Sequence, residues 1–171
     1  MTNAATTRVE GNTLIVERIF KAPRELVFKC YSEAEHLSAW WGPEGWSVPV
    51  CKVDFRPGGK WHYCMKCEDR AQGDFYGMES WGLGEYIEIQ PPEKIVYKDW
   101  FSDAEGNIDA NLPETLVALE FVELDDRTTK LINTATYISE EALRTVLDMG
   151  MLEGMGSTMA RLDVLLEELQ R

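Results

Sequence analysis

The chain has 171 residues, 44% hydrophobic and 27% charged, so it can bury a core without help from disulfides or metals. Its net charge of −13, from 30 acidic and 17 basic residues, argues against nucleic acids and anionic membrane surfaces as partners. No apolar run is long enough to span a membrane, and the four cysteines show no disulfide framework, which favours a cytoplasmic location. We expect one domain over residues 1–171.

The first quarter of the chain predicts a strand and two short helices. Residues 13–20 are rich in β-branched and other apolar side chains and predict a strand. Pro23 starts a helix over 24–32, because proline is tolerated in the first helical turn. A second helix over 34–39 runs into the tryptophan pair Trp40-Trp41 and is stopped by Gly42-Pro43.

The middle of the chain predicts strands joined by hairpins. The expected strands are 47–55, 60–67, 79–89, 94–101, 115–123 and 129–137. Gly82 and Gly84 indicate a bulge or strong curvature in the third of these strands. Because consecutive hairpins pair antiparallel, we expect an α+β fold with a curved antiparallel sheet of six to seven strands.

The last segment predicts one long helix, from Ser139 as the N-cap to Gln170. Its apolar residues recur every three or four positions and form a single stripe. Its first half is unusual, because 149–156 contains three glycines and three methionines. Glycine allows close approach and methionine fills irregular space, so this half either borders a cavity or forms a kinked core helix. The sheet is expected to grip this helix, with the two short helices closing one end.

Several segments resemble the AHSA-type branch of the SRPBCC (START-like, helix-grip) superfamily. They are residues 16–28, 36–43, 54–59, 84–97 and 103–107, in the order of that branch, and the resemblance covers about 13–169. It implies a deep, mainly apolar cavity between the sheet and the C-terminal helix. Relatives in the superfamily include small-molecule binders, toxin-resistance proteins, polyketide cyclases and the C-terminal domain of an activator of the heat-shock chaperone ATPase.

Aromatic and methionine side chains on the predicted strands and helix are the candidate ligand-binding residues. Together with one carboxylate they are Trp40, Trp41, Trp61, Tyr63, Met65, Trp81, Leu83, Glu85, Leu119, Phe121, Met151, Met155 and Met159. Aromatic rings supply large contact area at low entropic cost, which suits a flat or hydrophobic ligand. The alternative is a packed core without a cavity. Likewise, one ring of the Trp40-Trp41 pair lies near the cavity mouth, or both rings plug the end of the core.

Few residues in the sequence are candidates for catalysis or metal binding. Glu85 shares a predicted face with Leu83 inside the pocket, unless the bulge turns it to solvent. Cys64 and Cys67 form a CxxC, but three residues apart in a strand they point to opposite faces and cannot chelate a metal together. His62 lies on the face opposite Tyr63. We therefore expect no metal, no cofactor and no catalytic residue.

Three functions follow from these patterns. The leading hypothesis is a protein that buries a small hydrophobic or aromatic molecule in the cavity. The second is an enzyme resembling a polyketide cyclase or hydrolase, with Glu85 and Tyr63 as the only acid–base pair to name. The third is a chaperone-interacting module, against which stands the absence of the activator's separate N-terminal domain. Whether the chain forms a homodimer is open.

Overall fold

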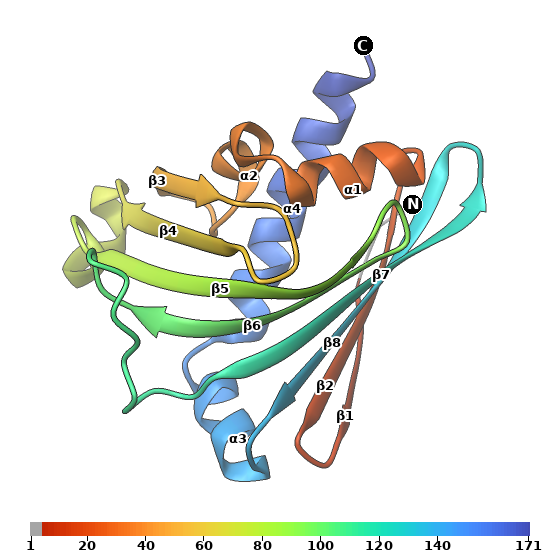
Figure 1. Cartoon of the computed structure of the whole chain (residues 1–171). Coiled ribbons are helices and arrows are strands. Elements are labelled where there is room, and N and C mark those ends of the chain that lie inside the picture. The colour runs from red at the N-terminus through yellow and green to blue at the C-terminus, as the bar shows by residue number, and fades with distance from the viewer. Residues whose placement is uncertain (1–4) are drawn as a thin grey trace.

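The protein is described here by a computed structural model that covers residues 5–171 and shows a curved antiparallel sheet wrapped around a long C-terminal helix (Figure 1). The strands are β1 (Thr6–Glu10), β2 (Thr13–Phe20), β3 (Trp46–Val53), β4 (Lys60–Cys67), β5 (Glu79–Gln90), β6 (Lys94–Ser102), β7 (Thr115–Asp125) and β8 (Thr128–Tyr137). The helices are α1 (Arg24–Ser32), α2 (Ala34–Trp40), α3 (Glu140–Asp148) and α4 (Met151–Leu169), with a 3₁₀ helix at Arg70–Phe75. This is the α+β helix-grip architecture.

The sheet contains eight strands in the order β1-β2-β8-β7-β6-β5-β4-β3, and every neighbouring pair is antiparallel. From β3 to β8 the chain is a meander, because each strand pairs with the next one in sequence. β8 then pairs with β2, so the N-terminal hairpin of β1 and β2 lies beside the last strand of the meander. Helices α1 and α2 therefore carry the chain from β2 to β3 at the far edge of the sheet, and they cover one end of it (Figure 1).

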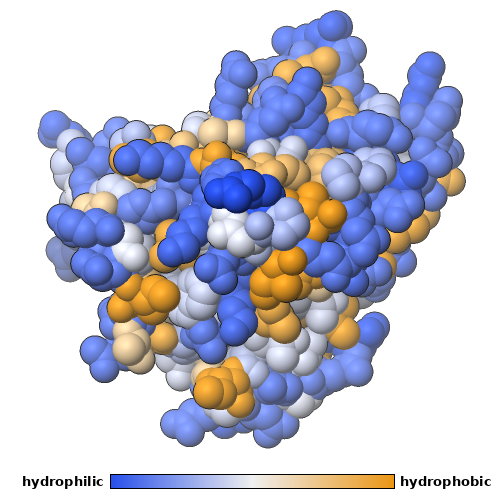
Figure 2. Space-filling view, viewed as in Figure 1, coloured by the Kyte–Doolittle hydropathy of each residue, from blue (hydrophilic) through white to orange (hydrophobic). Residues whose placement is uncertain are grey.

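The core lies between the inner face of the sheet and the helices. The inner positions of β7 are Val117, Leu119 and Phe121, all nearly inaccessible to solvent. The C-terminal half of α4 buries Leu162 and Leu166 in the same core, as its stripe predicts. In contrast, the outside of the molecule is mainly hydrophilic in the view of Figure 2, with hydrophobic side chains in small separate patches.

The strand count is higher than expected because of β1. All five residues of Thr6–Glu10 are exposed, and they pair with β2 alone at the edge of the sheet. An edge strand with no buried face lacks the apolar alternation by which a strand is recognised. The bulge in β5 also differs from expectation, since the register shifts between Tyr86 and Glu88 and not at the glycines.

The expected single C-terminal helix is two helices. Ser139 caps the first, accepting a hydrogen bond from the Ala142 backbone N–H. Gly150 then adopts a left-handed conformation with φ of 85° and separates α3 from α4. Among the described residues, no helix is long and apolar enough to cross a membrane.

Candidate functional site: a cavity between the sheet and helix α4

A cavity of about 280 Å³ lies between the inner face of the sheet and the N-terminal half of α4. Its aromatic walls are Tyr31, Trp40, Trp41, Tyr63, Tyr97 and Tyr137, and its methionines are Met65, Met151, Met155 and Met159. Asp99, Thr115, Asn133 and Thr158 add polar groups. Three of the methionines and Gly154 come from α4, so the glycine–methionine half of that helix borders the cavity.

A second pocket, of about 340 Å³, adjoins the first near the break between α3 and α4. Both pockets are lined by Tyr63, Met65, Asp99, Thr115, Tyr137 and Met151. The second pocket extends outward to Pro113, Met149 and Gly150. Asp99 therefore lies where the two spaces meet.

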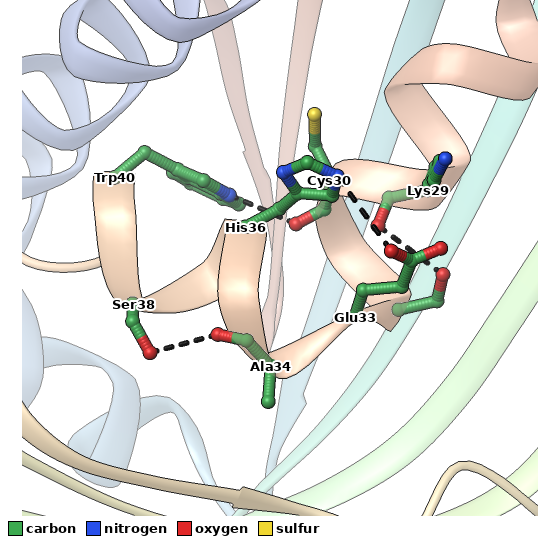
Figure 3. Close-up of polar contacts among 8 residues, drawn as sticks. Lys29, Cys30, Glu33, Ala34, His36, Ser38 and Trp40 are labelled. Carbon is green, nitrogen blue, oxygen red and sulfur yellow. Dashed lines mark hydrogen bonds and ion pairs between the residues drawn. The ribbon is translucent and has the colours of Figure 1, made fainter.

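The tryptophan pair occupies two different environments. The indole N–H of Trp40 donates to the carbonyl oxygen of Cys30 at 2.9 Å, which ties the end of α2 to α1 (Figure 3). Trp40 is only 1% exposed. Trp41 is half-buried and meets the rings of Trp40, Trp61 and Tyr63 edge-on, at centroid distances of 5.3, 4.7 and 5.7 Å. Trp40 thus holds α2 against α1, and Trp41 packs against the neighbouring rings and lines the cavity.

The central polar contact of the cavity joins Tyr63 on β4 to Asp99 on β6. The Tyr63 hydroxyl donates to the two carboxylate oxygens of Asp99 at 3.3 and 3.4 Å. The strand between them makes this possible: a Cβ atom on Gly82 would lie 2.2 Å from Cζ of Tyr63. The glycine is therefore required so that the Tyr63 ring can lie across β5 and reach β6.

Burial governs the ionisation of this pair. Apart from the surface that faces the cavity, Asp99 is enclosed by protein, and burial raises the pKa of its carboxyl to about 7, with the Tyr63 hydrogen bond acting in the opposite direction. Burial, and then the nearby Asp99 charge, raise the pKa of the Tyr63 hydroxyl well above its ordinary value. Near neutral pH, Asp99 can therefore either donate or accept a hydrogen bond, whereas Tyr63 stays protonated.

Of the thirteen residues predicted to bind ligand, seven line this cavity: Trp40, Trp41, Tyr63, Met65, Met151, Met155 and Met159. Trp61, Leu119 and Phe121 face the interior but are packed into the core, at 2–3% exposure. Trp61 still supports the site indirectly, because its ring packs against those of Trp41 and Tyr63.

The remaining three, Trp81, Leu83 and Glu85, lie on the outer face of β5, so the face assigned to them is wrong. Trp81 packs on the ring of His62, at a centroid distance of 5.1 Å, and it lines the second pocket but not the first. The register places Glu85 between Lys60 and Lys98 on the outer face. The inward positions of this stretch are Gly82 and Gly84: the Tyr63 ring occupies the space of a side chain at Gly82, and the Trp61 and Tyr97 rings lie at contact distance from a Cβ atom at Gly84.

His62 and the cysteines stand apart from the cavity. His62 lies within 2.9 Å of the backbone carbonyl oxygen of Asp103, on the outer side of the sheet. The four cysteines, at positions 30, 51, 64 and 67, are free thiols.

Sequence reasoning missed the residue that gives the cavity its polarity, Asp99, together with Tyr97 and Tyr137. A signal was present in β6, where Ile95, Tyr97, Asp99 and Phe101 are alternate residues. A carboxylate within an otherwise apolar row of alternate residues indicates an inward-facing acid. The paired glycines of β5 were the second signal, since they mark where large rings from neighbouring strands cross.

Comparison with known proteins agrees with this geometry. Residues 21–167 match the family model described as activator of Hsp90 ATPase homolog 1-like protein. The chain belongs to the AHSA1 family. A search of curated proteins finds no significant match.

Solved structures support the family and the fold. The AHSA1 chain is 31% identical to protein Ms6760 from Mycobacterium smegmatis, with a TM-score of 0.82 and 95% of each chain covered. It is 31% identical to a protein from Staphylococcus epidermidis, with a TM-score of 0.77 over 95% of this chain and 94% of the other. A protein from Arthrobacter aurescens gives 26% identity and a TM-score of 0.84, with 96% and 91% covered.

Proposed function

We propose that this AHSA1-family protein binds a small, mainly apolar, aromatic molecule in the cavity between the sheet and α4. The observation that carries the proposal is the composition of the cavity wall, six aromatic rings and four methionines around a few polar groups. Ligand sites combine apolar lining with a small number of placed polar groups in this way. A volume of about 280 Å³ is just below the usual range of roughly 300–1,000 Å³, which favours a ligand with one or two rings.

The test is titration with an environment-sensitive anilinonaphthalene fluorophore, followed by displacement with small aromatic compounds. Gly154→Leu is the informative variant, because Gly154 lines the cavity and a Cβ there would meet no atom within 4 Å. Filling the cavity in this way should weaken binding by about fivefold or more, because the ligand would have to share the space with the new side chain and overpacking costs about 1–3 kcal/mol.

Gly156→Leu is the matched control. Gly156 is also in α4 with open space around its Cβ position, but it is exposed and does not line the cavity. It should bind the fluorophore as the unmodified protein does. Equal affinity in all three proteins would reject the cavity as the binding site.

A second candidate function is acid–base catalysis on a substrate of the polyketide type, in the manner of a cyclase or hydrolase. The Tyr63–Asp99 pair favours it, because a general acid or base works best with a pKa near the operating pH. Asp99 here takes the place that sequence reasoning gave to Glu85. Mass spectrometry of aromatic polyketide thioester analogues incubated with the protein would detect turnover. Turnover unchanged by Asp99→Asn, or none with any analogue, would reject this candidate.

A further inference from the structure

Asp99 is a partly buried acid in the cavity wall. Among the residues that line the two pockets it is the only acid, and none of them is lysine, arginine or histidine. Its two contacts with the Tyr63 hydroxyl, at 3.3 and 3.4 Å, are longer than the roughly 2.5–3.0 Å of a strong O–H···O hydrogen bond. A carboxylate can accept about four hydrogen bonds. Most of the accepting capacity of Asp99 is therefore open toward the cavity.

The groups packed around Asp99 are neutral on every side. Cross-strand neighbours are Gly84 on β5 and Thr115 on β7, and Tyr137 on β8 follows Thr115 in the same row. Tyr97 lies two residues before Asp99 on the same face of β6, and burial raises the pKa of its hydroxyl well above the ordinary value, while Lys98 between them is exposed on the other face. From the helix side the cavity receives methionines. Nothing lining the pockets compensates a negative charge on Asp99.

The aromatic rings of the cavity also favour a positively charged ligand. The face of an aromatic ring carries negative potential and attracts a cation within about 6 Å of its centroid. Six aromatic side chains line a cavity of about 280 Å³, so a cation in that space has ring faces close by. An anion would meet those same faces, the Asp99 carboxyl and a protein of net charge −13.

We propose that the ligand of this cavity is an arylalkylamine, whose ammonium group pairs with Asp99 while its aromatic ring packs among Trp41, Met155 and Met159. This rests on the proposed function, since it names the class of molecule bound in the same cavity. The ammonium supplies the donors and the positive charge that Asp99 lacks. Because the carboxylate lies where the two pockets meet, substituents on the amine nitrogen extend toward the second pocket.

Isothermal titration calorimetry with a matched series tests the inference. 2-Phenylethylamine, 2-phenylethanol and 3-phenylpropionate share the ring and differ in the terminal group. At pH 7.5 the amine should bind at least about tenfold tighter than the alcohol, because hydrogen bonds to charged groups contribute about 1.5–3 kcal/mol. The carboxylate should bind weakest.

Asp99→Asn is the decisive variant, since it keeps the shape of the side chain and removes the charge. It should lower amine affinity to about the level of the alcohol and change alcohol affinity much less, because the alcohol carries no charge to pair with the carboxylate. Asp126→Asn is the control, an identical charge change at an exposed site in the hairpin at the opposite end of β7. Its affinities should match those of the unmodified protein.

Proton release gives a readout that a merely structural role for Asp99 would not produce. Free Asp99 is mostly protonated at pH 6, and pairing with an ammonium ionises it, so amine binding should release close to one proton at pH 6 and much less at pH 8. Comparing binding heats in buffers of different ionisation enthalpy measures this release. Asp99→Asn should abolish it.

The outcomes separate the inference from the proposed function. Alcohol and amine of equal affinity, or tighter binding of 3-phenylpropionate, would overturn the inference and leave cavity binding standing. If neither the series nor the fluorophore binds, the proposed function itself fails.

Discussion

The carboxyl of Asp99 is partly buried, and no positively charged residue lines the two pockets beside it, so its ionisation is coupled to folding. Its pKa rises from an ordinary 3.8 to about 7 in the folded protein. Between these values the unfolded chain has lost the proton while the folded protein keeps it. The free energy of unfolding contributed by this group therefore falls as pH rises from about 4 to about 7, and the loss is complete above that pH.

Replacing Asp99 by asparagine should remove this pH dependence. Relative to the unmodified protein, Asp99→Asn should gain stability between pH 5 and pH 8, by up to about 3 kcal/mol out of a full linkage of about 4 kcal/mol. Urea denaturation at both pH values measures the difference. Other titrating groups cancel in the comparison, and Asp126→Asn should show no such gain. A pH-independent difference for Asp99→Asn would mean that Asp99 is already ionised at pH 5 in the folded protein.

At the residue scale, sequence reasoning identified most of the apolar cavity wall but not its polar centre. Tyr63, Met65 and the α4 methionines follow from alternation and helical spacing. Trp81 and Leu83 were misplaced because apolar side chains in a strand were assumed to face the interior. In β5 the interior positions are the glycines, since the large rings of β4 and β6 occupy the space above them. Whether a position on one strand has room for a side chain depends on the side chains of the neighbouring strands, and the sequence of a single strand does not show this.

At the scale of elements, the three glycines of the last segment have three different roles. Gly150 ends α3 in a left-handed conformation, and its N–H donates to the Leu147 carbonyl. Gly154 continues α4 and borders the cavity, and Gly156 lies in the same helix on the exposed side. Sequence alone predicted one helix because a glycine in a helix and a glycine between two helices look alike. Only the backbone conformation distinguishes them.

The same substitution at two of these positions should change stability in opposite directions. Gly150→Ala should destabilise the protein by about 1–2 kcal/mol, because a Cβ atom is strained in the left-handed region. Gly154→Ala should stabilise it by up to about 1 kcal/mol, because alanine is the better helix former and a Cβ there meets no atom within 4 Å. Thermal unfolding followed by circular dichroism measures both. Two changes of the same sign would place the helix break elsewhere.

At the scale of the whole molecule, the order of strands and helices was largely predictable, but the cavity was not. Turn residues such as those at 56–59 and 91–93 mark the hairpins, and each expected strand lies within two residues of an observed one. The edge strand β1 escaped because it buries nothing. A cavity depends on where many side chains fail to meet, so the glycine–methionine segment left a kinked core helix as an alternative, and the family resemblance was what favoured the cavity.

Arg18 and Arg161 form hydrogen bonds that hold α4 against the rest of the protein. Arg18 on β2 donates to the Met159 carbonyl at 2.8 Å and pairs with Asp163 at 2.7 Å. On α4, Arg161 donates to backbone carbonyls of the segment between α2 and β3, among them Gly42 at 2.7 Å and Trp46 at 3.0 Å. These contacts connect the helix to β2 on one side and to the segment leading into the edge strand β3 on the other, and the second one fixes Gly42 and Pro43 at the cavity wall.

Arg161→Met should therefore affect both stability and the cavity. Methionine keeps much of the side-chain length but donates no hydrogen bond, so the carbonyls at 41, 42, 43 and 46 lose their shared donor. We expect a loss of about 1–3 kcal/mol in the free energy of unfolding, measured by urea denaturation, because hydrogen bonds from a charged donor are involved. Fluorophore affinity should fall as well, since the freed segment carries part of the wall. Arg144→Met in α3, an exposed site, is the matched control. If both variants unfold at the same urea concentration as the unmodified protein, Arg161 does not hold the grip closed, and the cavity wall is set by packing alone.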